Sequence, residues 1–363
     1  MFGWNDSDIC PIGMDVGTHS IRLVQFRQQK AQLTLLAARR VEIDSVPLAD
    51  SPEKHLTELL RNALETGDFR GRHCVISLPP ADIHAKSVRL PQMPENDLAH
   101  AIQWEAKDRF GLELADGRLV YFRAGEVRRG TEIKEELLLF AATGDTLRKY
   151  MGALAPLRFT IDAIDLAPCA MIRAVHRATP SKQNATTAIL DVGHTGAQFL
   201  LCVNDQIVFY KHIDIGGKTL NEAVAAKLGI SLTEATQIRS RLLLPATADE
   251  DGSAVPLQQA VYEAMRPKLE ELTRELDMCL RYYVVTFRGA RPEQVSVVGR
   301  QADCSQLLEI IANGLGIRVE AAPVLRGVSE LDDKARPDRS SEWAVAAGLS
   351  LYPVSRAKAP VAA

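Results

Sequence analysis

Hydrophobic and polar residues alternate along two stretches near the start of the chain, Ile21 to Arg27 and Gln32 to Ala38, with a polar turn between them. A period of two predicts β-strands with one buried face, so these stretches should form a hairpin. A second alternating pair, Gln198 to Val203 and Gln206 to Tyr210, predicts another hairpin turned by Asn204 and Asp205. Each hairpin directly follows a short apolar run that ends in a polar loop.

Other stretches carry apolar residues every three or four positions, which is the spacing of an amphipathic helix. The longest extends from Leu257 to Phe287 and contains Pro267, which should kink it. Another helix should begin after Ser51, a suitable cap, with Pro52 at its first position. The stretch Glu342 to Leu351 is rich in small residues and predicts a helix that contacts another helix closely.

The pattern changes between Ala81 and about Thr143, where a strand, a helix and two further strands are expected. We interpret these residues as a compact inserted subdomain. Its helix, Glu95 to Arg109, includes Trp104. Trp104 could be an exposed docking aromatic, but a core position on an amphipathic helix is the favoured expectation.

Composition narrows the possible classes of protein. At 363 residues the chain exceeds one ordinary domain, so two lobes are expected. A net charge of −3 provides no basic excess for nucleic acid or an anionic membrane. Six scattered cysteines without a C-x-x-C pair favour a reducing compartment over zinc or disulfides. With no signal-peptide pattern and no long apolar run, we expect no membrane insertion.

Two loops repeat one design about 175 residues apart: Met14-Asp15-Val16-Gly17-Thr18-His19-Ser20 and Leu190-Asp191-Val192-Gly193-His194-Thr195. A glycine at the bend allows backbone N–H groups to turn toward a phosphate, and the aspartates can hold the waters of Mg²⁺. Hydroxyl donors are expected from Thr18, Ser20 and Thr195. One such loop is most often a hairpin turn, but the ordered pair predicts a two-lobed nucleotide clamp.

A third glycine-containing segment, Gly216-Gly217-Lys218, follows the second hairpin and leads into a helix. Adjacent glycines before a helix allow a ligand to approach the backbone, and a helix N-terminus favours anions. Alone the segment would equally indicate a plain turn. In this position we expect it to form a third wall of the nucleotide cleft.

The order of these features resembles the superfold of actin, Hsp70 chaperones and sugar kinases, and within it the PilM family of type IV pilus assembly proteins, relatives of the division protein FtsA. The resemblance is carried by five stretches and the closing helix: Pro11 to Phe26, Ser87 to Glu105, Ile161 to Ala174, Ala188 to Arg239 and Glu275 to Glu320. It implies an α/β fold of the two-lobed, duplicated ribonuclease H-like type with an inserted α+β subdomain. The expected boundaries are 9–80 and 144–177 for the first lobe, 81–143 for the insertion, 186–352 for the second lobe and 353–363 for a flexible tail.

The resemblance also implies a function. It predicts a cytoplasmic protein that binds ATP and Mg²⁺ between its lobes and grips the cytoplasmic tail of a PilN-like inner-membrane protein. In that family the tail lies in a groove beside the inserted subdomain, which would hold the protein at the inner membrane through its partner. A homo-oligomer or ring is a further expectation, and the lack of a membrane-spanning run argues against the related secretion protein GspL.

The chain departs from the superfold's pattern at the catalytic and adenosine ends of the expected site. Ala167 stands where a glutamate often precedes the proline. Asp165, two residues earlier, is a candidate substitute for the catalytic base, and a structural role at the end of a strand is equally expected. Gly299 is followed by Arg300 rather than by a second glycine. At the expected ribose position Thr236 replaces an acidic residue, while Arg239 keeps the basic one. A slow or inactive ATPase that acts as a scaffold is therefore expected.

Two alternatives from other classes remain open. A sugar or metabolite kinase would need an aspartate base facing a sugar pocket, and the sequence offers no convincing one. An FtsA-like division protein would need an amphipathic C-terminal membrane helix, whereas Ser350 to Ala363 contains two prolines and no apolar face.

Overall fold

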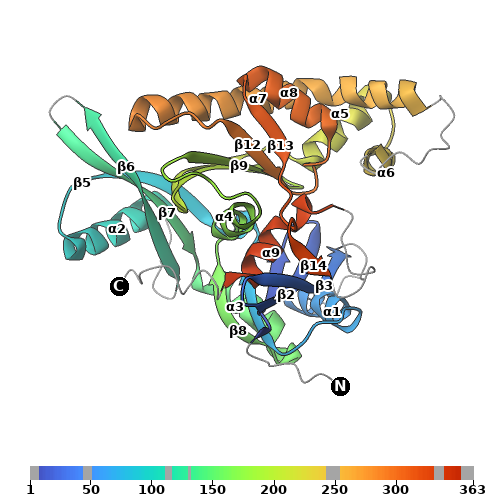
Figure 1. Ribbon diagram of the computed structural model, residues 1–363, viewed down its shortest axis with the longest axis horizontal. Coiled ribbons are helices and arrows are strands. Elements are labelled where there is room, and N and C mark those ends of the chain that lie inside the picture. Colours follow the sequence, from blue (N-terminus) through green and yellow to red (C-terminus); the bar gives the residue numbers. More distant parts are fainter. Residues whose placement is uncertain are drawn as a thin grey trace. The chain divides into compact units, whose positions relative to one another are not determined.

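The computed structural model describes residues 8–43, 51–110, 117–129, 132–242, 254–330 and 339–352. They divide into two compact units (Figure 1). Unit 1 lies within Met1–Ser181, Asp205–Val208 and Pro323–Ala363, and unit 2 within Lys182–Asn204 and Phe209–Ala322. The proposed tail, 353–363, lies outside the described residues. Along the described part of the chain, no helix combines the length and apolar character needed to cross a membrane.

Unit 1 is built on a six-stranded sheet whose strand order is β14-β3-β2-β1-β4-β8. β2 and β3 form the expected hairpin and are antiparallel, whereas β4 and β8 run parallel to β1. The strands are β1 (Ile12–Val16), β2 (Ser20–Gln29), β3 (Gln32–Glu42), β4 (His73–Ser77), β8 (Thr160–Asp165) and β14 (Val328–Glu330). The sequence analysis missed β14, a short strand that pairs with β3.

Helices cover this sheet, and their apolar faces form its core. α1 (Pro52–Glu65) begins as expected, because Ser51 accepts a hydrogen bond from the Lys54 amide. Leucines of α1 pack with residues of β1 and of α3 (Gly144–Leu154) in one buried cluster. α4 (Ala167–Ala178) and α9 (Ala344–Ser350) pack against each other, and α9 also contacts β1.

The close contacts of α9 explain why the chain from Pro323 onward belongs to unit 1, although the sequence analysis placed it with the second lobe. A Cβ on Gly348 would lie 1.9 Å from the Ala170 carbonyl oxygen of α4, and one on Gly13 would lie 2.0 Å from that of Ala346. The Ser350 hydroxyl donates to the Pro11 carbonyl at 2.8 Å. Small residues in α9 therefore fit it between β1 and α4, as its composition predicted.

The inserted strands and helix form a separate layer within unit 1. β5 (His84–Pro91), β7 (Glu132–Ala142) and β6 (Arg118–Arg129) form an antiparallel sheet in the order β5-β7-β6. α2 (Glu95–Phe110) packs along one face through Leu98, Ile102 and Ala106 (Figure 1). Trp104 is 67% exposed on the other side of α2, so the expected core position was wrong. Helical spacing places it about 160° from Ile102, away from the sheet.

Unit 2 is built on a five-stranded sheet with the order β11-β10-β9-β12-β13. Its strands are β9 (Thr186–Val192), β10 (Ala197–Val203), β11 (Gln206–Ile213), β12 (Gln294–Val298) and β13 (Arg318–Ala321). Its helices are α5 (Gly217–Leu228), α6 (Leu232–Leu242), α7 (Ala254–Phe287) and α8 (Ser305–Leu315). α7 continues through Pro267 as a single helix. The hairpin and parallel-strand pattern of unit 1 thus recurs around β9.

Candidate functional site

The first of the two repeated loops joins β1 to β2 in unit 1 and closes with a tight backbone turn. The Gly17 amide donates to the Ser20 carbonyl at 3.1 Å. A Cβ on Gly17 would lie 2.8 Å from that same oxygen, which explains why glycine stands there. Thr18 is exposed at the loop tip, whereas Ser20 is only 3% exposed. Of the two hydroxyls, Thr18 is the one available to a ligand in this structure.

Asp15 lies at the end of β1 in a row of polar residues that crosses four strands. Arg22 on β2 and Ser77 on β4 are its partners in register, and Asp165 on β8 is the partner of Ser77. In-register residues share one face of a sheet, so the fold brings these side chains together at the carboxyl ends of the parallel strands. Ligands of open α/β sheets bind at this edge.

The Asp15 carboxylate has one cationic and one neutral neighbour. Arg22 Nη1 lies 3.5 Å from Oδ2, and the Ser77 hydroxyl donates to Oδ1 at 3.4 Å. Burial raises the pKa of Asp15, while Arg22 and the Ser77 hydrogen bond oppose that rise. The carboxylate is thus held in a partly dry site where a bound cation would favour its charged form.

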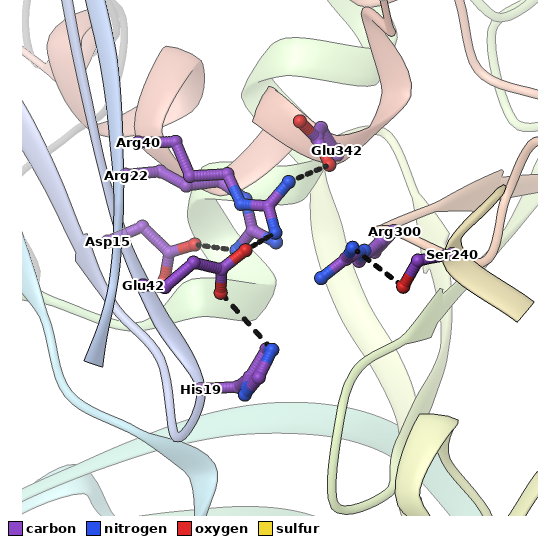
Figure 2. Close-up of polar contacts among 8 residues, drawn as sticks. All are labelled: Asp15, His19, Arg22, Arg40, Glu42, Ser240, Arg300 and Glu342. Atoms are coloured by element: carbon purple, nitrogen blue, oxygen red, sulfur yellow. Dashed lines mark hydrogen bonds and ion pairs between the residues drawn. The ribbon is translucent and has the colours of Figure 1, made fainter. Parts of the chain in front are cut away.

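A second arginine, Arg40, extends this cluster (Figure 2). It faces Arg22 across the β2–β3 pair, and the two side chains run alongside each other. Arg40 is ion-paired with Glu42 and lies 3.7 Å from Glu342. His19 Nε2 from the loop lies 3.1 Å from the other Glu42 oxygen. Three carboxylates, counting Asp15, therefore surround two guanidinium groups beside the first loop.

The side chain of Asp165, the proposed catalytic residue, is already bound to another residue of unit 1. Its carboxylate forms an ion pair with Arg173 on α4, and Arg173 Nε donates to the Gly348 carbonyl at 2.9 Å. α4 begins at Ala167 and has neither a side-chain cap nor an acidic residue in its first turn. Arg173 of α4 thus links the Asp165 carboxylate at the end of β8 to the backbone of α9.

The second loop, in unit 2, repeats the backbone turn of the first. The Gly193 amide donates to the Gly196 carbonyl at 3.0 Å, and Thr195 is exposed at the tip as Thr18 is in unit 1. Asp191 occupies the position on β9 that Asp15 occupies on β1, and its partner in register is Gln198. Gln198 donates to the Asp191 carboxylate at 3.1 Å and accepts from the Tyr210 hydroxyl at 3.0 Å. Burial, with the charge of Asp191, raises the pKa of Tyr210.

The Gly216-Gly217-Lys218 segment packs directly on this second loop. The Gly217 amide donates to the Gly193 carbonyl at 2.9 Å, and the Lys218 amide donates to that of His194 at 2.8 Å. A Cβ on Gly216 would lie 2.6 Å from the Gly196 nitrogen. In this structure the glycines allow a close approach to the protein's own loop, and the Lys218 side chain is exposed.

Gly299, at the end of β12, lies against Asp191. Its φ of 86° is in the left-handed region, and a Cβ there would lie 2.3 Å from Asp191 Oδ1. Both facts require glycine at this position. The next residue, Arg300, turns toward α6, where its Nη2 lies 3.3 Å from the Ser240 hydroxyl (Figure 2).

Arg239 is only 5% exposed, and its guanidinium N–H groups donate hydrogen bonds to other groups of the protein. It donates to the Gly217 carbonyl at 2.9 Å and to the Gln301 side chain at 2.7 Å, and it also bonds to the Asn221 side chain. Asn221 in turn donates to Thr236 at 2.8 Å. Burial lowers the pKa of Arg239 to about 10. A ribose could reach this guanidinium only by exchanging these hydrogen bonds.

Comparisons with known proteins agree with this arrangement. A family model described as type IV pilus assembly protein PilM matches residues 13–353. The chain belongs to the PilM family. The solved structure of a "PilM-PilN type IV pilus biogenesis complex" superimposes with a TM-score of 0.75 at 20% identity, covering 95% of this chain and 98% of that one.

Two other solved structures share the fold. Ethanolamine utilization protein EutJ from Carboxydothermus hydrogenoformans matches with a TM-score of 0.54 at 14% identity, over 95% of this chain and 89% of that one. A diol dehydratase-reactivating factor in nucleotide-free form also has a TM-score of 0.54, at 10% identity, covering 96% of this chain and 99% of that one. The predicted α/β, actin-like fold is thereby confirmed.

The sequence analysis missed several residues of both half-sites. Simple hairpin arithmetic would have found two of them. Four residues, 17–20, separate the paired Val16 and Ile21 and so place Arg22 opposite Asp15, and residues 193–196 place Gln198 opposite Asp191 in the same way. No local pattern marks the contacts of Arg40 with Glu342, or of Asn221 and Gln301 with Arg239, because they join segments distant in sequence. The sequence analysis also missed Glu42, which pairs with Arg40.

Proposed function

We propose that this member of the PilM family is a nucleotide-binding scaffold of type IV pilus assembly. In this proposal it holds the cytoplasmic tail of a PilN-like inner-membrane protein and hydrolyses ATP slowly or not at all. It would thus work in the cytoplasm, at the inner membrane through its partner.

The observation that carries the nucleotide part is the repeated half-site. Each unit has an aspartate at the end of a central strand, a glycine-closed turn after it and an exposed threonine at the tip. Backbone amides and hydroxyls of such turns are ligands for phosphate, and aspartates hold the waters of Mg²⁺. Asp15 and Asp191 are the residues that would hold this ion.

Two arginine N–H groups beside the first loop could donate to a further acceptor. Arg22 Nε and Arg40 Nε are buried, and neither has a hydrogen-bond partner among the described residues. A buried donor without an acceptor is costly, and an anion or an ordered water would satisfy it. Three carboxylates surround these two arginines, so the cluster offers N–H donors to a bound group but no net positive charge.

The residues at the expected adenosine-binding and catalytic positions support weak binding of ATP and slow hydrolysis. Arg239 would have to leave its hydrogen bonds with Gly217 and Gln301 to contact a ribose. Asp165 is paired with Arg173, and Ala167 cannot act as a base. Loss of one positioned base commonly lowers a rate by about 10²- to 10⁴-fold.

The nucleotide proposal is tested by calorimetric titration of the whole protein with ATP and Mg²⁺. We expect binding that Asp15→Asn and Asp191→Asn each weaken by about ten-fold, since each removes one charged ligand of the ion. Glu309→Gln, an exposed position on α8, is the control and should bind as wild type does. Absence of any heat or competition signal from folded protein would contradict nucleotide binding.

The partner proposal is supported by the superimposable PilM-PilN complex and by a surface of the insertion. On the sheet face opposite α2, Val120 is 46% exposed and lies beside Phe122, which contacts Phe140 edge to face. An apolar strip on a strand suits an extended peptide, which can add main-chain hydrogen bonds at a sheet edge.

The partner proposal is tested separately, by fluorescence anisotropy with a labelled tail peptide of a PilN-like protein. Val120→Asp should weaken binding by about ten-fold or more, because it places a charge in an apolar contact. Val285→Asp is a matched control, since Val285 is also exposed but lies on α7 of unit 2. If no tail peptide binds with or without nucleotide, the docking role is wrong.

A further inference from the structure

The outer face of α2 in the inserted subdomain carries a line of exposed side chains. Leu98, Ile102 and Ala106 occupy the inner face and pack on the sheet. The outer line consists of Asp97, His100, Trp104 and Lys107, all of them exposed. Trp104 is the largest exposed apolar side chain of the described residues, at 67%. A tryptophan in such a position is far more common at interfaces than on bare surface.

The four residues have the spacing of a helix-pairing seam. Intervals of three, four and three residues keep them on one side of the helix over about 15 Å. In an antiparallel helix pair, position a of one helix lies opposite position d of the other. Asp97 and Trp104 occupy position a, and His100 and Lys107 occupy position d. The spacing of these four positions is therefore the same from either end of the helix.

Because the spacing is symmetric, the four residues can pair with the same four residues of a second α2. If a second α2 lies antiparallel across it with the twofold axis at Ile102, Asp97 faces the partner's Lys107 and Trp104 faces the partner's His100. Each contact then occurs twice, as in any interface with twofold symmetry. Every charge meets its opposite and each aromatic ring meets another ring. A parallel pairing would instead place Asp97 against the partner's Asp97.

The groups concerned are available for these contacts. Within the described part of the chain, neither Asp97 nor Lys107 has an ion-pair partner. The His100 Nδ1 donates to the Asn96 carbonyl at 2.9 Å, and the residue is exposed. No rearrangement of α2 is needed before a partner helix can pack on it.

We propose that α2 is a self-association surface whose partner is a second copy of this chain, packed antiparallel through Asp97, His100, Trp104 and Lys107. One helix pair is a small interface, so the dimer should be weak, with a dissociation constant of about 10–100 μM. Where a membrane partner concentrates the protein, such a contact would link neighbouring copies.

Charge exchange tests the pairing directly, by sedimentation equilibrium of the whole protein between about 5 and 500 μM. Asp97→Lys places two lysines at each end of the seam, and Lys107→Asp places two aspartates there. Each variant should weaken dimerisation by about ten-fold or more. The double variant Asp97→Lys/Lys107→Asp restores opposite charges and should dimerise within about three-fold of wild type.

A mixture of the two single variants gives the most specific test of the pairing. Asp97→Lys protein carries lysine at positions 97 and 107, and Lys107→Asp protein carries aspartate at both. The mixture should therefore form heterodimers at concentrations where each variant alone is mostly monomeric. Trp104→Ala should abolish dimerisation, and Glu309→Lys, a charge reversal on exposed α8, should leave it unchanged. Wild-type protein that remains monomeric at about 500 μM, or a dimer insensitive to the exchanges, would overturn the proposal.

Discussion

At the scale of single residues, the two half-sites differ in the side chain that faces each aspartate. Asp15 faces the cationic Arg22, whereas Asp191 faces the neutral amide of Gln198. A guanidinium favours the charged carboxylate, and burial disfavours it. At Asp15 burial is the larger effect and raises its pKa. This residue should therefore make the free energy of unfolding depend on pH.

The sign of this dependence follows from proton binding. With the pKa of Asp15 raised in the folded state above its ordinary value of 3.8, the folded state holds the proton over a pH range in which the unfolded state has lost it. Stability then falls as pH rises through that range. Asp15→Asn lacks this loss, so the variant should gain stability relative to wild type as pH rises from about 4 toward neutrality. Urea unfolding across this range would measure it, and a difference that stays constant or shrinks would contradict the assignment.

Gly299 provides a second prediction at this scale. Gly299→Ala should lower the free energy of unfolding by about 2–4 kcal/mol, because it adds both left-handed strain and a clash with Asp191. Gly316→Ala is a matched control: its φ is 63°, but a Cβ there has nothing within 4 Å, so only the strain of about 1 kcal/mol remains. Equal effects in urea unfolding would show that Asp191 does not restrict position 299.

At the scale of elements, α9 depends on how closely backbones approach. Gly348→Ala would place a Cβ 1.9 Å from the Ala170 carbonyl oxygen, so α4 and α9 must separate. We expect a loss of about 3 kcal/mol or more, at the upper end of overpacking costs. Gly152→Ala in α3 is the control, since a Cβ there meets nothing within 4 Å and alanine is the better helix former by about 1 kcal/mol. Opposite shifts of the thermal midpoint are expected, and shifts of the same sign would contradict the packing.

At the scale of the whole molecule, the proposed slow hydrolysis would follow from one missing carboxylate. Ala167→Glu introduces an acid in the first turn of α4, where the helix dipole favours it. If both half-sites hold the nucleotide as proposed, single-turnover hydrolysis should rise by about 10²-fold. Ala167→Gln tests for an effect of size alone and should leave the rate unchanged. A folded Ala167→Glu protein that binds ATP but hydrolyses no faster would show that more than the base is missing.

The sequence by itself determined most elements and the repeat. Alternation and three-to-four spacing predicted the hairpins, the inserted subdomain and the long helix, because local burial patterns follow from backbone period. The paired Asp15 and Asp191 loops and their closing glycines were also predictable, since a turn's glycine requirement is local. Together they indicated the fold and the family that the comparisons confirm.

Only the tertiary structure decided what each side chain faces. The contacts of Arg40 with Glu342 and of Arg239 with Gln301 join segments far apart along the chain, so no local pattern encodes them. Trp104 was misplaced for a related reason: a large apolar residue usually gains free energy by burial, but the side of α2 on which it lies is set by the register of Leu98 and Ile102 against the sheet. Periodicity limits which residues can share a face, and packing decides which face is covered.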